Sequence, residues 1–329
     1  MNVKQAPTPR IVRTIKPELA DPAPMPSESH TENGAGTETS VAASNVTATV
    51  IVPVYNEEKA IESVIASIKT ALTPLDMKYE IIVVDDGSTD QSSRIISNID
   101  GIRYIQHPKN TGYGSALKTG IRYAEGEFVV ITDGDGTYPN QAIPGLIRAS
   151  AEHDMIVGAR SINDHNIPLI RKPAKWLLGK LANYLSETVI PDLNSGLRVF
   201  RRDVALRFYK IFPSGFSFTT TITLAMHCNG YRVKYVPIEY NKRAGKSKIR
   251  PIHDTINFIQ LILRTVMYFN PLKIFLPIAT FVFIAFLLSS IVDIVVRENL
   301  TDKTVIFFLA FVQILVLGLL ADLIDKRNS

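Results

Sequence analysis

Two aspartates, Asp133 and Asp135, alternate with glycines directly after an apolar run at residues 128–131. The run is short, uncharged and rich in β-branched residues, so it predicts a strand buried on both faces of a sheet. Carboxylates at the carboxyl end of such a strand suit a hard divalent cation that binds the phosphates of a substrate. Open α/β sheets hold their ligands at that edge. The alternative is an ordinary strand-to-turn Asp-Gly pair without a ligand.

Alternating strands and helices should position these carboxylates. Strands are predicted at residues 47–54, 79–84, 102–106, 128–131, 155–158 and 232–240, with a further turn into a strand at residues 194–200. Helices are predicted at residues 59–71, about 90–99, 142–153 and 218–229, and residues 110–115 open a further helix that reaches residue 124. This alternation predicts an α/β fold, with a mostly parallel sheet and helices on both faces.

Polar residues follow two other predicted strands. Tyr55 follows the first, and Asp85 and Asp86 end the second. In a parallel sheet these residues converge with Asp133 at one edge. Asp85 could accept hydrogen bonds from a base or a ribose, or it could cap the next helix.

Gly112 and Gly114 open the helix that precedes the central strand. A glycine-rich helix start can cradle a phosphate. A plain turn is the alternative.

The composition limits the other possibilities. The chain has 329 residues and a net charge of +5, which allows one large or two medium domains. Its single cysteine, Cys228, excludes an intrachain disulfide and gives no sign of an oxidising compartment. No apolar segment begins the chain, so no cleavable signal peptide is expected. Residues 1–45 are polar and proline-rich without apolar periodicity, which predicts a disordered tail.

Two uncharged apolar stretches near the end of the chain approach the length of a helix that crosses a bilayer. We expect transmembrane helices at about residues 274–296 and 304–324, within a segment 273–329. Lys and Arg flank both sides of this hairpin, so both chain ends and the α/β domain at residues 46–250 should be cytoplasmic. Residues 251–272 predict an amphipathic helix, which either lies in the membrane interface or packs on a core.

Several short motifs occur along the chain in the same order as in a known protein family. Pro53-Val-Tyr-Asn-Glu57, Asp85-Asp-Gly-Ser88, Asn110-Thr-Gly-x-Gly114 and Asp133-Gly-Asp135 resemble the family 2 glycosyltransferases. Val157-Gly-Ala-Arg160, Ser195-Gly-Leu-Arg198 and Arg243-x-Gly-Lys-Ser-Lys248 are similar to those of the dolichyl/polyprenyl-phosphate sugar synthases, such as dolichol-phosphate mannose synthase. The resemblance covers residues 46–250, the expected catalytic domain.

The resemblance implies a GT-A type fold that binds a nucleotide sugar and transfers one sugar, with inversion, to a polyprenyl or dolichyl phosphate. It implies that Asp133 and Asp135 hold Mg²⁺ or Mn²⁺ on the donor diphosphate, Asp135 being counted as catalytic. Arg160 and Arg198 would act on the acceptor phosphate or on developing charge. The implied donor-binding residues are Pro53, Tyr55, Glu57, Asp85, Gly112, Lys118, Asp133, Arg243 and Lys248.

The chain departs from its relatives at two places. Thr137 stands where many relatives carry Gln, and Thr219, Thr220 and Thr221 stand where relatives often carry a glutamate. A phosphate acceptor is already an anionic nucleophile, so no strong general base is required. The Gln-x-x-Arg-Trp signature of processive synthases is absent from the sequence, which favours single transfer.

Other functions stay open at this stage. The acceptor could be a different lipid, or the chain could be a non-catalytic subunit that binds a nucleotide sugar at a membrane. UDP-glucose and GDP-mannose are both plausible donors, and a homo-oligomer is compatible with the sequence. The basic loop at residues 241–250 adjoins a predicted span, so lipid phosphates are nearer partners than nucleic acid; a solvated basic face is the alternative.

Overall fold

The computed structural model describes residues 12–13, 47–160, 179–180, 182–184, 186–215, 217–240, 260, 263–264, 266–268, 270–297 and 299–328. The chain divides into two compact units. The first unit comprises Met1–Ile162, Asn194–Thr219 and Val233–Lys246. The second unit comprises Asn163–Leu193, Thr220–Arg232 and Ser247–Ser329.

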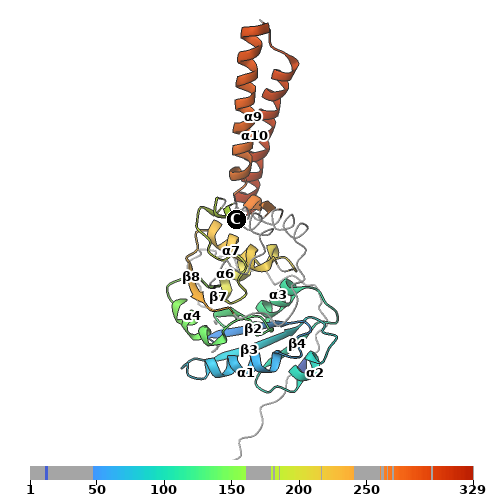
Figure 1. The fold of residues 1–329 in the computed structure, drawn as a ribbon, viewed down its shortest axis with the longest axis vertical. Helices are drawn as coiled ribbons and strands as arrows, with labels where there is room; N and C mark the ends of the chain where they lie inside the picture. Colours follow the sequence, from blue (N-terminus) through green and yellow to red (C-terminus); the bar gives the residue numbers. More distant parts are fainter. Residues whose placement is uncertain are drawn as a thin grey trace, which may run out of the picture. The chain divides into compact units, whose positions relative to one another are not determined.

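The first unit is built on an eight-stranded sheet (Figure 1) with the order β1-β4-β3-β2-β5-β7-β6-β8. Its strands are β1 (Val12–Arg13), β2 (Ala48–Val54), β3 (Tyr79–Asp85), β4 (Arg103–Gln106), β5 (Phe128–Ile131), β6 (Met155–Arg160), β7 (Arg198–Arg201) and β8 (Val233–Ile238). Each pair is parallel except the two made by β7, which runs antiparallel to β5 and to β6. The prediction of a mostly parallel sheet is confirmed.

Helices cover both faces of this sheet, because β2 is apolar on both sides. Val50 and Val52 belong to the buried cluster that contains the apolar face of α1 (Ile61–Leu72). Ile51 points to the other face, toward α3 (Tyr113–Tyr123), where a Cβ on Gly120 would come within 2.4 Å of its side chain. Figure 1 shows α1 and α3 on opposite sides of β2 and β3.

The remaining helices follow the predicted order but are shorter than expected in places. They are α2 (Ser92–Ser97), α4 (Ile143–Ala149) and α7 (Phe218–Cys228), with 3-10 turns at Asn140–Ala142 and Tyr209–Ile211. A further helix, α6 (Arg202–Arg207), was not predicted. β6 continues past the predicted residue 158 to Arg160, which makes this arginine the last residue of its strand.

The tail contributes one contact that the sequence did not predict. Val12 and Arg13 pair with Tyr104 and Ile105 at the edge strand β4. These two residues lie in a polar segment without periodicity, so no strand pattern marks them. The other residues of the predicted tail, the basic loop at residues 241–250 and most of the predicted helix at 251–272 lie outside the described residues.

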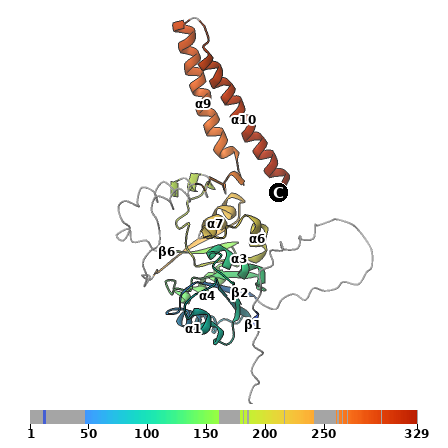
Figure 2. The same cartoon turned by 90° about the vertical axis from the view of Figure 1, so that its right-hand side faces the viewer.

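The second unit contains two long apolar helices that lie side by side (Figures 1 and 2). They are α9 (Leu272–Val292), continued by a π-helical turn (Asp293–Arg297), and α10 (Asp302–Asn328). Over Leu272–Val296 and Asp302–Ile324 they are long and apolar enough to cross a membrane, and only 11% of each apolar window is buried. Phe283 packs on Phe311 with ring centroids 4.8 Å apart. Their exposed apolar surface is that of helices facing lipid.

A polar cluster closes the turn of this hairpin. The buried Asp293 carboxylate accepts hydrogen bonds from the Thr301 amide at 2.9 Å and from the hydroxyls of Thr301 at 2.5 Å and Thr304 at 2.6 Å. The hydroxyls of Ser289 and Thr304 are 2.6 Å apart. Asp293 therefore caps the start of α10 from the end of α9.

Candidate active site

The strand ends meet at one edge of the sheet, as the sequence predicted. The Thr132 amide still donates to the Ile51 carbonyl of β2 at 3.2 Å, and Asp133 follows directly. Gly134 packs beside β2, where a Cβ would lie 3.1 Å from the Pro53 carbonyl oxygen. Asp85 ends β3 in register with Val54 of β2. The edge therefore brings Pro53, Asp85 and Asp133 into neighbouring positions.

Asp133 lies between the start of α3 and the turn before β7. The Tyr113 hydroxyl donates to Asp133 Oδ1 at 2.8 Å. A Cβ on Gly196 would be 2.8 Å from Asp133 Oδ2, so only glycine allows this approach. The Gly196 amide donates to the Tyr138 hydroxyl at 2.6 Å. The carboxylate is partly exposed, so a ligand can reach it.

Asp135 is oriented by its own loop. Its Oδ1 accepts hydrogen bonds from the amide of Thr137 at 3.1 Å and from the hydroxyl of Thr137 at 2.7 Å. Thr137 is buried, and Gly136 adopts the left-handed φ of 74° that the loop needs. The threonine at the position of the relatives' Gln therefore holds Asp135 in place.

Arg160 joins the same cluster from the end of β6. Its guanidinium carbon lies 5.4 Å from the centre of the Tyr240 ring, a cation–π distance, and that ring packs edge-on against Tyr138 at 5.1 Å. Burial raises the pKa of Tyr138, the nearby Asp133 raises it further, and Arg160 opposes both. Tyr138 therefore interacts electrostatically with both the Asp133 carboxylate and the Arg160 guanidinium, so Arg160 belongs to the electrostatic environment of the acidic site.

Arg198 has a different environment from the one the sequence suggested. Its side chain is 0% exposed. The guanidinium donates to the Ser195 carbonyl at 3.0 Å and 2.5 Å and to the Thr219 carbonyl at 3.1 Å. These contacts brace the turn that carries Gly196 against Asp133, so the geometry favours a positioning role over direct contact with a phosphate.

The aspartate pair that ends β3 is used within the protein. Asp85 is fully buried and accepts hydrogen bonds from the Ser88 amide at 2.9 Å, the Tyr104 hydroxyl at 3.1 Å and the Ser93 hydroxyl. These bonds join Asp85 to the loop after β3, to α2 and to β4, and they favour a structural role over contact with a base or a ribose. Asp85 does not cap α2, whose first turn has no side-chain cap hydrogen bond at Gln91.

Gly112 and Lys118 likewise have intramolecular partners. The Gly112 amide donates to the Asp86 carboxylate at 2.7 Å, which favours a turn over a phosphate cradle. The Lys118 ammonium donates to the Phe212 carbonyl at 3.2 Å and lies 4.8 Å from the centre of the Tyr209 ring. Both residues therefore contribute to packing of α3 in the described structure.

The residues predicted to border the nucleoside lie beside this edge, at the end of β2 and in the loop that follows it: Pro53, Tyr55 and Glu57. Tyr55 is 39% exposed, Pro53 is buried, and the Glu57 amide donates to the Ser92 hydroxyl at 2.9 Å. Asn56 takes a left-handed φ of 57°, a conformation that asparagine tolerates, and its side-chain oxygen accepts from the Thr89 amide at 2.8 Å. The loops after β2 and β3 are thus locked together. Arg243 and Lys248 lie outside the described residues.

The donor set fits a hard cation. Within the part of the chain that the structure describes, no three or more His, Cys, Asp or Glu side chains group as a metal cage. Asp133 and Asp135 offer two carboxylates, and Mg²⁺-type ions commonly bind one or two carboxylates together with substrate phosphates and water. A site completed by the donor diphosphate is therefore the kind that these residues could form.

Sequence reasoning missed the three tyrosines of this cluster, Tyr113, Tyr138 and Tyr240. Tyr113 is the variable position of the motif Asn110-Thr-Gly-x-Gly114, and Tyr138 directly follows Thr137. These positions are a signal that could have identified them. Tyr240 precedes the basic loop and could not be placed without the fold.

Comparisons with known proteins agree with this arrangement. Residues 49–208 match the family model for glycosyl transferase family 2, and residues 270–326 match the GtrB C-terminal hairpin. The chain is 31% identical over 204 residues to a dolichyl-phosphate hexose transferase of Haloferax volcanii, covering 61% of this chain and 86% of that protein. It is 30% identical to an undecaprenyl-phosphate 4-deoxy-4-formamido-L-arabinose transferase of Aeromonas hydrophila, spanning 47% of this chain and about half (49%) of that relative.

The fold has solved relatives as well. Glucosyl-3-phosphoglycerate synthase from Mycobacterium tuberculosis, solved with Mn²⁺, uridine diphosphate and phosphoglyceric acid, superposes with a TM-score of 0.52 at 22% identity. The match covers 67% of this chain and 78% of that one, and it is a likeness of fold. The chain belongs to glycosyl transferase family 2 and carries the hairpin found in the GtrB group. It is a glycosyltransferase.

Substitution of Arg198 by Lys tests its positioning role. We expect a clear loss of thermal stability, because a single ammonium cannot reach both the Ser195 and the Thr219 carbonyls, and a buried carbonyl without a partner costs about 1–3 kcal/mol. Thermal melting of the detergent-solubilised chain measures it. Arg201→Lys, on the same strand but exposed, is the control and should be nearly neutral. A normal melting temperature for Arg198→Lys with a raised KM for the acceptor would instead support direct contact with substrate.

Proposed function

We propose that this chain transfers one sugar from a nucleotide sugar to a polyprenyl or dolichyl phosphate at a membrane surface, with inversion. One observation carries the proposal: the Asp133 carboxylate and the Arg160 guanidinium both act on Tyr138 at the edge of the sheet, in a chain with an apolar hairpin. The names of the relatives, a dolichyl-phosphate hexose transferase and an undecaprenyl-phosphate sugar transferase, support the choice of acceptor.

Asp133 and Asp135 would hold Mg²⁺ or Mn²⁺ against the donor diphosphate. When bound, such an ion neutralises the negative charge that grows on the leaving nucleoside diphosphate. Thr137 orients Asp135 for this role, and Gly196 and Tyr113 confine Asp133. The partial exposure of both carboxylates leaves a path for the phosphates.

Arg160 would bind the phosphate of the acceptor. Guanidinium groups make bidentate contacts with phosphate oxygens, and the Tyr240 ring holds this guanidinium on one side. An acceptor phosphate is anionic at neutral pH and attacks without a strong general base. The threonines Thr219, Thr220 and Thr221, in place of a family glutamate, are consistent with that chemistry.

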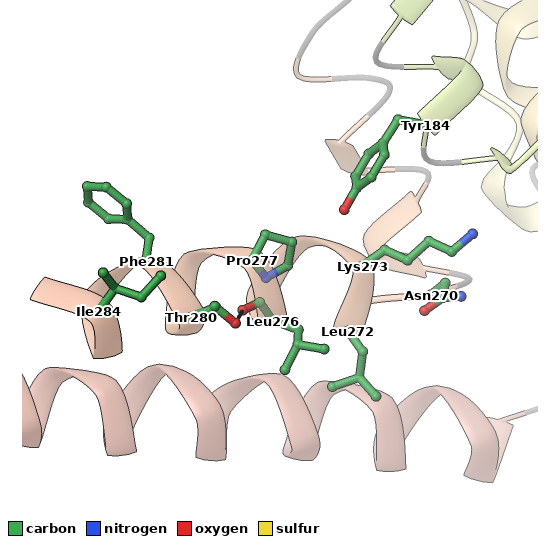
Figure 3. A pocket seen from close by; sticks show the side chains of 9 residues that line it. All are labelled: Tyr184, Asn270, Leu272, Lys273, Leu276, Pro277, Thr280, Phe281 and Ile284. Carbon is green, nitrogen blue, oxygen red and sulfur yellow. Dashed lines mark hydrogen bonds between the residues drawn. The ribbon is translucent and has the colours of Figure 1, made fainter. Parts of the chain in front are cut away.

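A groove on the second unit suits the hydrocarbon chain of a lipid. It has a volume of about 550 Å³ and is lined by Tyr184, Asn270, Leu272, Lys273, Leu276, Pro277, Thr280, Phe281 and Ile284. Figure 3 shows the side chains of Leu272 to Ile284 along the first turns of α9, with Asn270 just before the helix and Tyr184 on a separate segment. Lys273 pairs with Glu187 at 2.9 Å at its polar end, and apolar side chains follow along the helix. This gradient from charge to hydrocarbon suits a lipid with an anionic head.

Removal of Asp135 should abolish transfer. We expect Asp135→Ala to lose at least about a hundredfold in kcat, because a carboxylate that holds the cation is worth several kcal/mol to the transition state. The assay follows lipid-linked sugar formed from a panel of UDP and GDP sugars and a polyprenyl phosphate in detergent. Glu152→Ala, an exposed acid before β6, should retain activity. Full activity of Asp135→Ala would reject the metal role.

The same assay separates the second candidate, transfer to a lipid without a phosphate. It is run with polyprenyl phosphate, the matching polyprenol and a diacylglycerol. Product from the phosphate alone supports the proposal, and product from the alcohols would replace it. Binding of a donor with no product from any acceptor would point to a non-catalytic subunit.

Narrowing the groove should affect long acceptors only. Thr280→Trp fills space beside Leu276 and Phe281, so we expect KM for a long-chain polyprenyl phosphate to rise about tenfold, since each buried CH₂ contributes about 0.8 kcal/mol. KM for a short, water-soluble isoprenyl phosphate should not change. Ile291→Trp, exposed on α9 and away from the groove, is the control. If Thr280→Trp changes KM relative to the wild type by the same factor for the long and the short acceptor, this lipid site is disproved.

We also propose that the catalytic domain and both chain ends are cytoplasmic. In a chain with Cys228 replaced by Ser, a cysteine at position 300, exposed in the loop between the spans, should react with a membrane-impermeant thiol reagent in intact cells. A cysteine at position 125, in the first unit, should react only after the cells are opened. The opposite labelling pattern would reverse the orientation.

A further inference from the structure

The first residue of α3, Tyr113, contacts the acidic site through its hydroxyl group. The Tyr113 hydroxyl donates to Asp133 Oδ1 at 2.8 Å. A phenol that donates to one carboxylate oxygen restricts rotation of the carboxylate and so directs its lone pairs. Groups that hydrogen-bond to a metal ligand in this way fix its orientation and contribute to metal affinity.

A buried network sets the position of Tyr113. The Asp86 carboxylate accepts hydrogen bonds from the Thr111 amide at 2.9 Å, the Thr111 hydroxyl at 2.7 Å and the Gly112 amide at 2.7 Å, and the His107 ring lies 2.8 Å away. The other nitrogen of His107 contacts the Thr119 hydroxyl of α3 at 2.9 Å. Asp86 therefore holds both residues that precede Tyr113.

The backbone of this turn admits no other residue at position 112. Gly112 has a φ of 105°, and a Cβ there would lie 2.4 Å from the Ser214 carbonyl oxygen. Burial opposes the charged form of Asp86, but hydrogen bonds from His107, Thr111 and Gly112 lower its pKa below the ordinary value. The charged carboxylate of Asp86 therefore holds this turn at neutral pH. This turn sets the orientation of Tyr113 at the start of α3.

We infer that Tyr113 is a positioning residue for the metal-binding carboxylate Asp133, and that the Asp86 turn aims it. The inference rests on the proposed function, in which Asp133 and Asp135 hold the divalent cation. Tyr113 itself touches neither substrate nor metal; its hydroxyl acts through Asp133.

Direct measurement of metal binding tests this inference. Mn²⁺ is titrated into the full chain in detergent with saturating UDP or GDP, and free Mn²⁺ is followed by electron paramagnetic resonance. We expect Tyr113→Phe, which keeps the ring and removes only the hydroxyl, to weaken Mn²⁺ binding by about 10-fold or more. The melting temperature in EDTA shows that the variant is folded. Tyr79→Phe loses the same atom at the amino end of β3 and should bind Mn²⁺ as the wild type does.

Kinetics separate positioning from a general structural role. If Tyr113 acts through Asp133, the Mn²⁺ concentration for half-maximal rate rises and kcat returns at saturating Mn²⁺. A structural role lowers kcat at every Mn²⁺ concentration. In an Asp133→Asn background, adding Tyr113→Phe should cause no further loss of Mn²⁺ affinity; a second, additive loss would mean that the tyrosine acts independently and would overturn the inference.

The outcomes distinguish this inference from the function on which it depends. If the wild-type chain binds no Mn²⁺ with either nucleotide, the proposed metal site fails. If the wild type binds Mn²⁺ and Tyr113→Phe binds it equally well, the metal site stands and the positioning role of Tyr113 is wrong.

Discussion

The close approach of Gly196 to the carboxylate of Asp133 is the constraint on which the acidic edge depends. A side chain at position 196 would collide with Asp133, and the amide of the same glycine reaches the Tyr138 hydroxyl. The turn is held there by Arg198, a buried guanidinium that donates to backbone carbonyls on both sides. β7, which runs antiparallel to β5 and to β6, starts from this turn. The turn thus closes one side of a site that parallel strands build.

The charged residues around this turn fall into two groups, one partly exposed and one buried. Asp133, Asp135 and Arg160 keep some exposure and lie where a ligand can reach them. Asp85, Asp86 and Arg198 are buried and satisfied by protein groups, because an unpaired buried charge would be too costly. The buried set shapes the loops, and the partly exposed set contains the residues to which we assign the chemistry.

Much of the fold was predictable from periodicity and turn residues. The apolar runs at residues 128–131 and 79–84 are strands within one residue of their expected ends, because buried parallel strands read as uninterrupted β-branched runs. The convergence of Asp133 with Pro53 and Asp85 followed from parallel pairing alone. The roles of Arg198 and Asp85 did not, since a motif shows that a residue is charged but not whether its side chain turns inward. Tyr240 reaches Arg160 only because β8 pairs with β6, a long-range register that no local pattern encodes.

The polar cluster at the hairpin turn bears on how the two spans form. Asp293 ends α9, and its hydrogen-bond donors, Thr301 and Thr304, belong to the start of α10. A helix that entered hydrocarbon alone would carry this carboxylate without those donors, at a cost of several kcal/mol at the membrane centre. The donors at the start of α10 offset this cost, which favours insertion of the two helices as a pair.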